Sequence, residues 1–259
     1  MILRTGNGVA YYQFEHLAAF AEINHGIFAR TPGHSLPPFQ QLNVSLAVGD
    51  DVRRVEHNRR LVARCMQAGQ LVFAHQVHGD AVLVVEGRAA RPFAADELKS
   101  PVGDAMVTAQ PGQFLVVTVA DCQPILMYDP RRRVVANVHS GWRGNVTNVA
   151  GRTLAVMAER FGCDPADVRV GIGPSLGPCC AEFVNYRQEI PRELWGYRRD
   201  SVYFDFWAMS RDQLTGAGVP QDQIHISGLC TKCRTDRFFS YRGERQTGRF
   251  PAVIGLRQQ

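Results

Sequence analysis

Short runs of apolar and β-branched residues in the middle of the chain predict three strands joined by tight turns. The runs cover residues 116–120, 125–128 and 134–139. β-Branched runs of this length favour strands over helices. Pro124 disfavours helix at the residue before it, and Asp129-Pro130 begins a turn. We expect this hairpin to bring the Cys122 thiol close to the His139 imidazole.

The rest of the chain alternates between helical and strand patterns. Helices are expected from Asp50 or Asp51 to about Ala68, over 145–161, over 182–194 with a break at Pro191, and from Asp205 to Leu214. Strands are expected at 22–29, at 71–77 with 81–86 as its hairpin partner, and at 168–172, 201–204, 223–228, 238–242 and 252–256. A polar loop covers 87–103. The simplest interpretation is one α+β domain spanning residues 1–259, without repeats or linkers.

Composition indicates a globular protein of a reducing compartment. Hydrophobic residues make up 45% of the chain, and no apolar run is long enough to span a membrane. The N-terminal residues lack the apolar core of a secretion signal. Seven cysteines, of which Cys179 and Cys180 are adjacent, argue against a disulfide framework. We therefore expect a cytoplasmic protein that does not associate with membranes.

Arginine dominates the positive charge. The net charge is +5, and Lys99 and Lys232 are the only lysines among 29 basic residues. Arginine suits phosphate and carboxylate groups, because its planar fork binds them with two hydrogen bonds. No basic run is interleaved with aromatic residues as on a nucleic-acid surface, so no nucleic-acid partner is expected.

Candidate chemistry gathers at the strand ends. His78, which lies beside a glycine turn, is a third candidate ligand after Cys122 and His139. His75 is expected to be structural. Residues His75 and His78 are three apart and would face opposite sides of a strand, so we do not expect both to bind one metal. The glycine-rich segment after His139 contains Arg143 and precedes a predicted helix N-terminus, which favours an anion.

Five motifs give the chain a family resemblance. They are QVHG at 76–79, ADC at 120–122, HSGWRG at 139–144, GPSLG at 173–177, and FSYR at 239–242 with TGR at 247–249. In this order they resemble the YfiH family, whose members are also called laccase-domain proteins, polyphenol oxidases and peptidoglycan editing factors. The resemblance extends from Leu42 to the C-terminus. It implies a four-layer fold with two mixed β-sheets packed between helices.

The same resemblance implies a metal centre and an activity. His78, Cys122 and His139 match the family's metal ligands and are also our catalytic candidates, together with Arg143. Asn43, Arg59, Gln76 and Arg143 are expected to bind substrate. The implied enzyme is a zinc-dependent purine nucleoside phosphorylase that converts adenosine, inosine or S-methyl-5'-thioadenosine and phosphate to the base and a ribose 1-phosphate. Adenosine deaminase activity is implied as well.

Several alternatives remain open at this point. Two histidines and one cysteine suit zinc, and they also suit copper. A multicopper oxidase needs more histidines, usually in His-X-His pairs, and the chain has eight histidines and no such pair. Cys122 and His139 also fit a cysteine hydrolase, such as an amidohydrolase that edits peptidoglycan precursors. A metal-binding partner protein without turnover is the third class.

The other cysteines and the oligomeric state are less defined. Four of these cysteines have a pattern that suits a second zinc site, because Cys-X-X-Cys is a ligand spacing. They are Cys179, Cys180, Cys230 and Cys233. We expect free thiols instead, because two adjacent cysteines are awkward ligands for one tetrahedral ion. The chain is expected to be a monomer or a small homo-oligomer.

Overall fold

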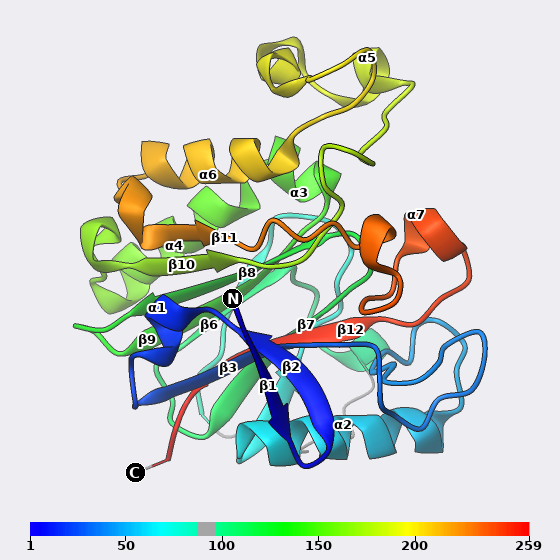
Figure 1. The fold of residues 1–259 in the computed structure, drawn as a ribbon. Helices are drawn as coiled ribbons and strands as arrows, with labels where there is room; N and C mark the ends of the chain where they lie inside the picture. Colours follow the sequence, from blue (N-terminus) through cyan, green and yellow to red (C-terminus); the bar gives the residue numbers. More distant parts are fainter. Residues whose placement is uncertain (88–96, 259) are drawn as a thin grey trace.

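Two β-sheets stacked face to face form the centre of the protein in a computed structural model that describes residues 1–87 and 97–258 (Figure 1). Within these residues each sheet has six strands. The first has the order β1 (Ile2–Gly6), β2 (Val9–Gln13), β3 (Ile23–Phe28), β12 (Phe250–Leu256), β7 (Gln113–Val119) and β4 (Gln70–Phe73). The second has the order β11 (Ile224–Ile226), β10 (Arg169–Ile172), β8 (Gln123–Asp129), β9 (Val134–Ser140), β6 (Ala105–Thr108) and β5 (Val82–Val84). Both sheets mix parallel and antiparallel pairs.

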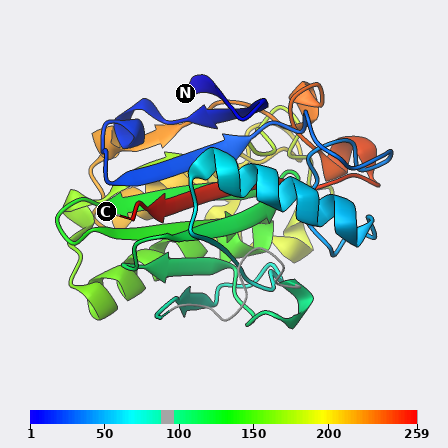
Figure 2. The same ribbon diagram turned by 90° about the horizontal axis from the view of Figure 1, so that it is seen from below.

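Helices cover the outer faces of the two sheets. Helix α2 (Val52–Met66) packs on the first sheet (Figure 2). Its buried Val62 and Met66 join the cluster that includes Phe114. Helices α4 (Val149–Phe161) and α6 (Phe206–Gly216) cover the second sheet. The short helices are α1 (Glu15–Ala18), α3 (Trp142–Val146), α5 (Tyr186–Glu189) and α7 (Tyr241–Glu244). The expected α+β fold, two mixed sheets between helices in four layers, is confirmed.

The largest apolar cluster lies between the sheets. Ile27, Leu115 and Ile254 from the first sheet meet Leu126 and Val135 from the second, and all five are buried. These strands are covered on both faces, which explains why they appear in the sequence as continuous apolar runs rather than as alternating patterns. The chain crosses from the first sheet to the second between β7 and β8, and Cys122 lies at that crossing.

Several predicted elements are confirmed. The hairpin of β8 and β9 pairs Pro124 with His139, as its turn chemistry indicated. Helix α2 begins after Asp51, whose side chain accepts a hydrogen bond from the Arg54 amide, and α6 begins after Asp205 in the same manner. Local capping therefore determines where both helices start.

Other predicted elements were wrong. The 81–86 segment is not a hairpin partner of 71–77, because β5 pairs in parallel with β6 in the other sheet. Residues 238–242 form no strand but lead into α7, which Ser240 caps. The predicted helix over 182–194 is reduced to α5 and a 3-10 turn, Arg192–Tyr197.

The segment 201–204 contributes only isolated bridges, and the N-terminal strands β1 and β2 were not predicted. The loop expected over 87–103 falls partly on 88–96, which lie outside the described residues. No helix in the described part of the chain is long and apolar enough to cross a membrane.

Candidate metal centre

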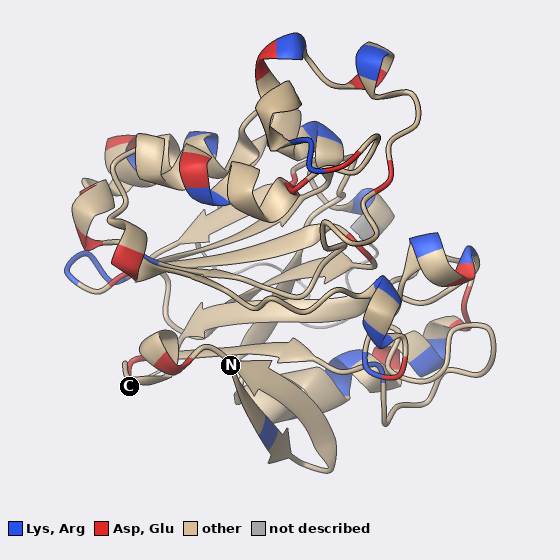
Figure 3. Cartoon of the chain, turned by 45° about the horizontal axis from the view of Figure 1, so that its top comes forward, with Lys and Arg blue, Asp and Glu red and all other residues tan. Residues whose placement is uncertain are grey.

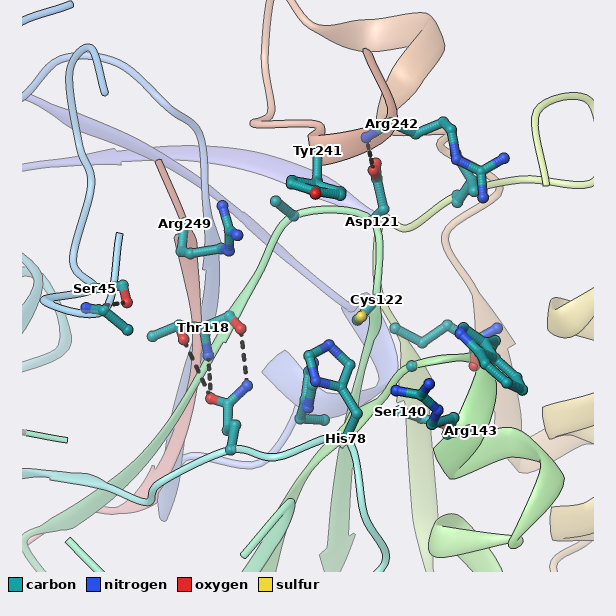
Figure 4. Close-up of a pocket in the computed structure, with 18 of the residues that line it drawn as sticks. Ser45, His78, Thr118, Asp121, Cys122, Ser140, Arg143, Tyr241, Arg242 and Arg249 are labelled. Carbon is teal, nitrogen blue, oxygen red and sulfur yellow. Dashed lines mark hydrogen bonds between the residues drawn. The ribbon is translucent and has the colours of Figure 1, made fainter. Parts of the chain in front are cut away.

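Three side chains from separate parts of the chain converge at the ends of the central strands. The ligand atoms of His78, Cys122 and His139 all lie within 4.8 Å of one another. The ring of His139 is buried, Cys122 is half-buried and His78 is exposed. In the view of Figure 4, His78 and Cys122 lie between Arg249 and Arg143. Three ligands with one open side is the arrangement of a catalytic metal site.

Asp104 holds two of these ligands in place. Its Oδ1 lies 2.7 Å from Nδ1 of His139 and accepts the backbone N–H of His78 at 2.9 Å. The Oδ2 atom accepts the N–H groups of Val77 and Gly79. Burial alone would raise the pKa of Asp104, but the hydrogen bond from His139 and these backbone N–H groups lower it. The carboxylate is therefore ionised and fixes His139 with its proton on Nδ1, which leaves Nε2 to face the other ligands.

The cysteine and the buried histidine form a charged pair. Burial alone would raise the pKa of the Cys122 thiol, but the His139 and His78 imidazoles lower it to about 6. Burial alone would lower the pKa of His139, but Cys122 and Asp104 raise it to about 9. At neutral pH the sulfur is thus a thiolate, which is the form that binds metals and attacks electrophiles.

Asp121 controls the direction of the cysteine beside it. Its backbone has a φ of 88°, an uncommon conformation for a residue other than glycine. Four hydrogen bonds hold it there. The Asp121 carboxylate accepts hydrogen bonds from Thr231 Oγ1 at 2.6 Å, Ser240 Oγ at 2.7 Å and the Arg242 amide at 2.6 Å. The Asp121 carbonyl accepts the Leu176 amide N–H at 2.8 Å. Distant loops therefore stabilise a strained turn at the centre.

Gly141 gives the ligands room. A Cβ atom at this position would lie 2.9 Å from Cδ2 of His78 and 3.1 Å from Sγ of Cys122. Its φ of −74° is open to any residue, so the requirement is for space rather than for backbone freedom. The glycine of the HSGWRG motif is thus explained by close packing against two of the three ligands.

The ligands open into a cavity of about 680 Å³. Four arginines line it: Arg143, Arg242, Arg245 and Arg249. Its aromatic lining includes Trp142, Phe183, Phe206 and Tyr241. Basic residues are visible on α7 and on the neighbouring turn that follows β11 (Figure 3). The cavity combines positive charge with apolar walls beside the three ligands.

The predicted site residues fall into two groups. Arg143 and Gln76 line the cavity with the three ligands. The amide of Gln76 is engaged with β7, since its Oε1 accepts the Thr118 N–H at 2.9 Å and its Nε2 donates to the Thr118 carbonyl at 3.0 Å. Gln76 therefore fastens the loop that carries His78.

The structure places Asn43 and Arg59, the other two predicted substrate-binding residues, outside the cavity lining. Both are fully buried and neither lines the cavity. Arg59 Nε donates to the Val44 carbonyl at 2.8 Å, and its guanidinium lies 4.0 Å from the centre of the Phe73 ring. Asn43 Oδ1 accepts the Arg249 N–H at 2.9 Å, so Asn43 acts on the cavity through Arg249.

The expected anion site at a helix N-terminus is corrected. The segment after His139 is itself the short helix α3, and the long helix α4 begins only at Val149. Asn148, at a φ of 56°, separates them and caps α4 by accepting the Gly151 N–H at 3.0 Å. Arg143 lines the cavity from α3, and the N-terminus of α4 lies beyond Asn148 in the chain.

Sequence reasoning missed several residues of the centre. Asp104, Asp121, Arg245 and Arg249 all act on it, and only Asp121 and Arg249 lie within a recognised motif. Their roles depend on hydrogen bonds between residues far apart in the chain, such as the pair of Asp104 and His139. The signal in the sequence for Asp104 was its position directly before the apolar run 105–108, where a side chain is expected to be buried.

A second group of potential ligands lies outside this centre. The sulfur atoms of Cys179, Cys180, Cys230 and Cys233 are all within 4.8 Å of one another. Within residues 1–87 and 97–258, two groups of three or more potential ligands come this close together: these four cysteines, and His78 with Cys122 and His139. The four sulfur atoms therefore come close together although Cys179 and Cys180 are adjacent in the chain.

Known proteins match nearly the whole chain. A family model described as multi-copper polyphenol oxidoreductase laccase matches residues 24–257. A protein of Geobacillus stearothermophilus named purine nucleoside phosphorylase YlmD is 35% identical over 256 residues, 93% of this chain and 92% of that protein. The Escherichia coli protein named purine nucleoside phosphorylase YfiH is 32% identical over 238 residues, 88% of this chain and 91% of that protein.

Solved structures agree with these matches. The crystal structure of YlmD from Geobacillus stearothermophilus has a TM-score of 0.88 at 33% identity and covers 98% of both chains. A Bacillus licheniformis protein described as hypothetical protein YfiH has a TM-score of 0.87 at 30% identity, covering 98% of this chain and 99% of that one. Sequence and fold therefore match along the same length.

Proposed function

The chain belongs to the YfiH, or laccase-domain, family, and from this membership we propose that it is a purine nucleoside phosphorylase with a zinc centre. The observation that carries the proposal is the cavity in which His78, Cys122 and His139 lie beside four arginines. Relatives named purine nucleoside phosphorylase supply the reaction class, and the cavity supplies groups suited to both of its substrates.

The donor set fits zinc. Two imidazoles and one thiolate within 4.8 Å of one another, with an exposed side at His78, match a three-ligand site that keeps one position open. The hydrogen bond that His139 Nδ1 donates to the Asp104 carboxylate is of the kind that usually orients metal-binding histidines. Bound zinc would polarise a substrate oxygen or lower the pKa of a water toward ~7. The laccase description of the family leaves copper as the competing metal.

Phosphate has a binding surface in the same cavity. Phosphorolysis joins a phosphate oxygen to the ribose C1 carbon and breaks the bond from that carbon to the base. Arg143 lies at 4.8 Å over the Trp142 ring, and Arg245 and Arg249 line the cavity as well. Guanidinium groups bind phosphate oxygens with paired hydrogen bonds and stabilise the negative charge during transfer.

The aromatic lining suits the purine. Trp142 and Phe183 meet at 6.0 Å between ring centres, and Tyr241 is half exposed at the cavity rim. A cavity of about 680 Å³ is ample for a nucleoside together with phosphate. The proposed substrates are adenosine, inosine and S-methyl-5'-thioadenosine. Adenosine deamination at the same centre would be a separate reaction, in which water attacks the purine carbon that bears the amino group and ammonia leaves.

The thiolate–imidazolium pair favours one competing function. A thiolate at Cys122 beside a charged His139 is the arrangement of a cysteine hydrolase, which would cleave amides such as those of peptidoglycan precursors without metal. A multicopper oxidase finds less support, because the two groups of potential ligands in the described residues contain only two histidines between them, His78 and His139.

One assay separates these functions. Purified protein is incubated with each nucleoside, with and without phosphate, and the products are identified by mass. We expect base and ribose 1-phosphate only when phosphate is present, and we expect activity to be lost with a chelator and restored by zinc. Amide cleavage of a peptidoglycan precursor that survives metal removal but is lost on alkylation of Cys122 would support the hydrolase. Absence of turnover on all three nucleosides would overturn the proposal.

A further inference from the structure

The four-cysteine cluster lies where two loops meet next to the metal centre. One loop carries Cys179 and Cys180 after β10, and the other carries Cys230 and Cys233 after β11. The loops are joined by backbone hydrogen bonds on both sides of Ser175, whose N–H donates to the Leu229 carbonyl and whose carbonyl accepts the Thr231 N–H. The positions of the four sulfur atoms are therefore determined by the pairing of β10 and β11.

Backbone turns point the adjacent thiols in one direction. The N–H groups of Cys180 and Ala181 both donate to the Gly177 carbonyl at 2.9 Å, which folds the chain tightly after Pro178. The other pair belongs to a Cys-X-X-Cys segment on a 3-10 turn, Lys232–Arg234. This spacing is typical of one half of a four-cysteine zinc site.

The sulfur spacing matches a tetrahedral ion. Sγ of Cys233 lies 3.7 Å from Sγ of Cys179 and 3.6 Å from Sγ of Cys180. Four sulfurs about 2.3 Å from a central zinc are about 3.8 Å apart, whereas two disulfide-bonded sulfurs are separated by about 2.05 Å. Since Cys233 has two sulfur neighbours at nearly equal distance, a shared ion explains the cluster better than a single bond.

A further contact completes the surroundings of the buried member. Sγ of Cys230 accepts the Gly177 N–H at 3.3 Å, a bond that stabilises negative charge on the sulfur. Lys232 and Arg234 flank Cys233 in the sequence, and the Arg234 guanidinium is paired with the Asp236 carboxylate at 2.8 Å. Soft thiolate ligands without histidine or carboxylate select a metal such as zinc.

We propose that Cys179, Cys180, Cys230 and Cys233 form a second zinc site with a structural role. The site would clamp the two loops that brace the strained turn at Asp121, since Thr231 donates to the Asp121 carboxylate and Leu176 donates to its carbonyl. All four positions are occupied by protein ligands, which is typical of a structural rather than a catalytic zinc. The proposal does not depend on the nucleoside reaction.

Metal content of full-length variants tests the proposal. After expression with zinc and removal of loosely bound metal, elemental analysis is expected to give about two zinc ions per chain in the wild type. Cys122→Ala is expected to keep about one, and the double variant Cys230→Ser, Cys233→Ser is also expected to keep about one. The matched control Cys65→Ser, Cys163→Ser removes two thiols outside both groups and should keep both ions. Equal zinc content in the wild type and the Cys230→Ser, Cys233→Ser variant would overturn the proposal.

A second measurement avoids variants of the cluster, because such variants can impair folding. Cys122→Ala is stripped of metal under reducing conditions and titrated with cobalt(II) alone. We expect thiolate-to-cobalt charge-transfer bands and tetrahedral d–d bands that saturate at about one cobalt per chain. Absence of these bands, or a disulfide within the cluster under the same reducing conditions, would contradict the site.

Discussion

The carboxylate of Asp104 lies 2.7 Å from Nδ1 of His139 and also accepts the backbone N–H of His78 at 2.9 Å. One buried aspartate thus orients two candidate ligands, one through its ring and the other through its backbone. Because both ligands depend on it, Asp104 couples the loop after β4 to the end of β9.

Replacing this aspartate should weaken the centre without removing a ligand. In Asp104→Asn the charge that stabilises the Nδ1–H form of His139 is lost, and one amide N–H faces backbone donors. We expect zinc affinity and turnover to fall about 10–100-fold. Zinc affinity is measured by competition with a chromophoric chelator.

The matched control for that variant is Asp80→Asn. Asp80 is two residues from His78 but pairs with Arg152 at 3.2 Å, away from the ligands. Its zinc affinity should equal that of the wild type. An Asp104→Asn protein with unchanged affinity and turnover would show that the hydrogen bonds are not needed to orient the ligands.

Cys122→Ala should abolish nucleoside turnover and remove the zinc of the first centre. The variant takes away one of three protein ligands and the only sulfur among them. Elemental analysis and the nucleoside assay are done on protein whose folding is checked by circular dichroism. Cys163→Ala, which removes a buried thiol of the core beneath α4, serves as the control and should cost only about 1 kcal/mol of stability.

The outcomes for Cys122→Ala distinguish the two enzyme classes. A folded variant that keeps its full zinc but is inactive would support a cysteine nucleophile. A variant that keeps both zinc and turnover would exclude Cys122 from the chemistry altogether.

Arg143→Ala should impair the use of phosphate more than deamination. Its guanidinium lines the cavity, and deamination uses water instead of phosphate. Loss of a charge-assisted hydrogen bond predicts a rise of about tenfold or more in the KM for phosphate. Steady-state kinetics with inosine and varied phosphate measure this, and adenosine without phosphate reports deamination.

Arg160→Ala is the control for Arg143→Ala, because Arg160 pairs with Glu86 outside the cavity. Its phosphate KM should not change. Equal losses of phosphorolysis and deamination in a folded Arg143→Ala protein would remove Arg143 from the phosphate site. Arg245 and Arg249 would then be the next residues to test.

Gly141→Ala should disturb the centre although it changes no ligand. The added methyl group would lie 2.9 Å from His78 and 3.1 Å from Cys122. Overpacking of this kind costs about 1–3 kcal/mol, and here the strain falls on metal ligands. We expect lower zinc affinity, measured by chelator competition. Gly216→Ala is the control, since nothing lies within 4 Å of a Cβ there, and normal zinc binding by Gly141→Ala would contradict the prediction.

The parts of the site that follow from local sequence were predictable. The hairpin that pairs Pro124 with His139 depends on one turn and two apolar runs, so the sequence indicated that Cys122 and His139 would meet. The order of motifs added His78 through the family resemblance. The four-layer arrangement also came from the resemblance, because periodicity alone does not distribute strands between two sheets.

The remaining parts depend on contacts between distant segments. Asp104 binds residues 26 and 35 positions away, and Asp121 is held by Thr231 and Ser240 from more than a hundred positions away. The break between α3 and α4 depends on Asn148 in a left-handed conformation, which asparagine tolerates but the apolar stripe does not reveal. The four-cysteine cluster depends on the parallel pairing of β10 and β11.

His25 should make the protein less stable in acid. It is 1% exposed, and its Nε2 accepts the Phe14 N–H at 2.9 Å, so the folded state requires a neutral ring. Burial, with a contribution from His16, lowers the pKa of His25 from its ordinary value of 6.5 to about 3. Between these two values the unfolded chain binds a proton that the folded protein does not. The stability that His25 contributes is therefore complete above pH 6.5 and declines by about 1.4 kcal/mol per pH unit as the pH falls toward 3.

Denaturant unfolding at several pH values between 6.5 and 4.5 tests this. In His25→Gln, the side-chain oxygen can still accept the Phe14 N–H but does not titrate, so the slope of unfolding free energy against pH should be smaller by about one proton. Part of the slope should remain, because burial also lowers the pKa of His16, to about 4. The control His34→Gln replaces an exposed histidine and should leave the slope unchanged. A neutral buried ring at His25 requires that difference of one proton. If His25→Gln has the same slope as the wild type, the acid sensitivity therefore arises elsewhere.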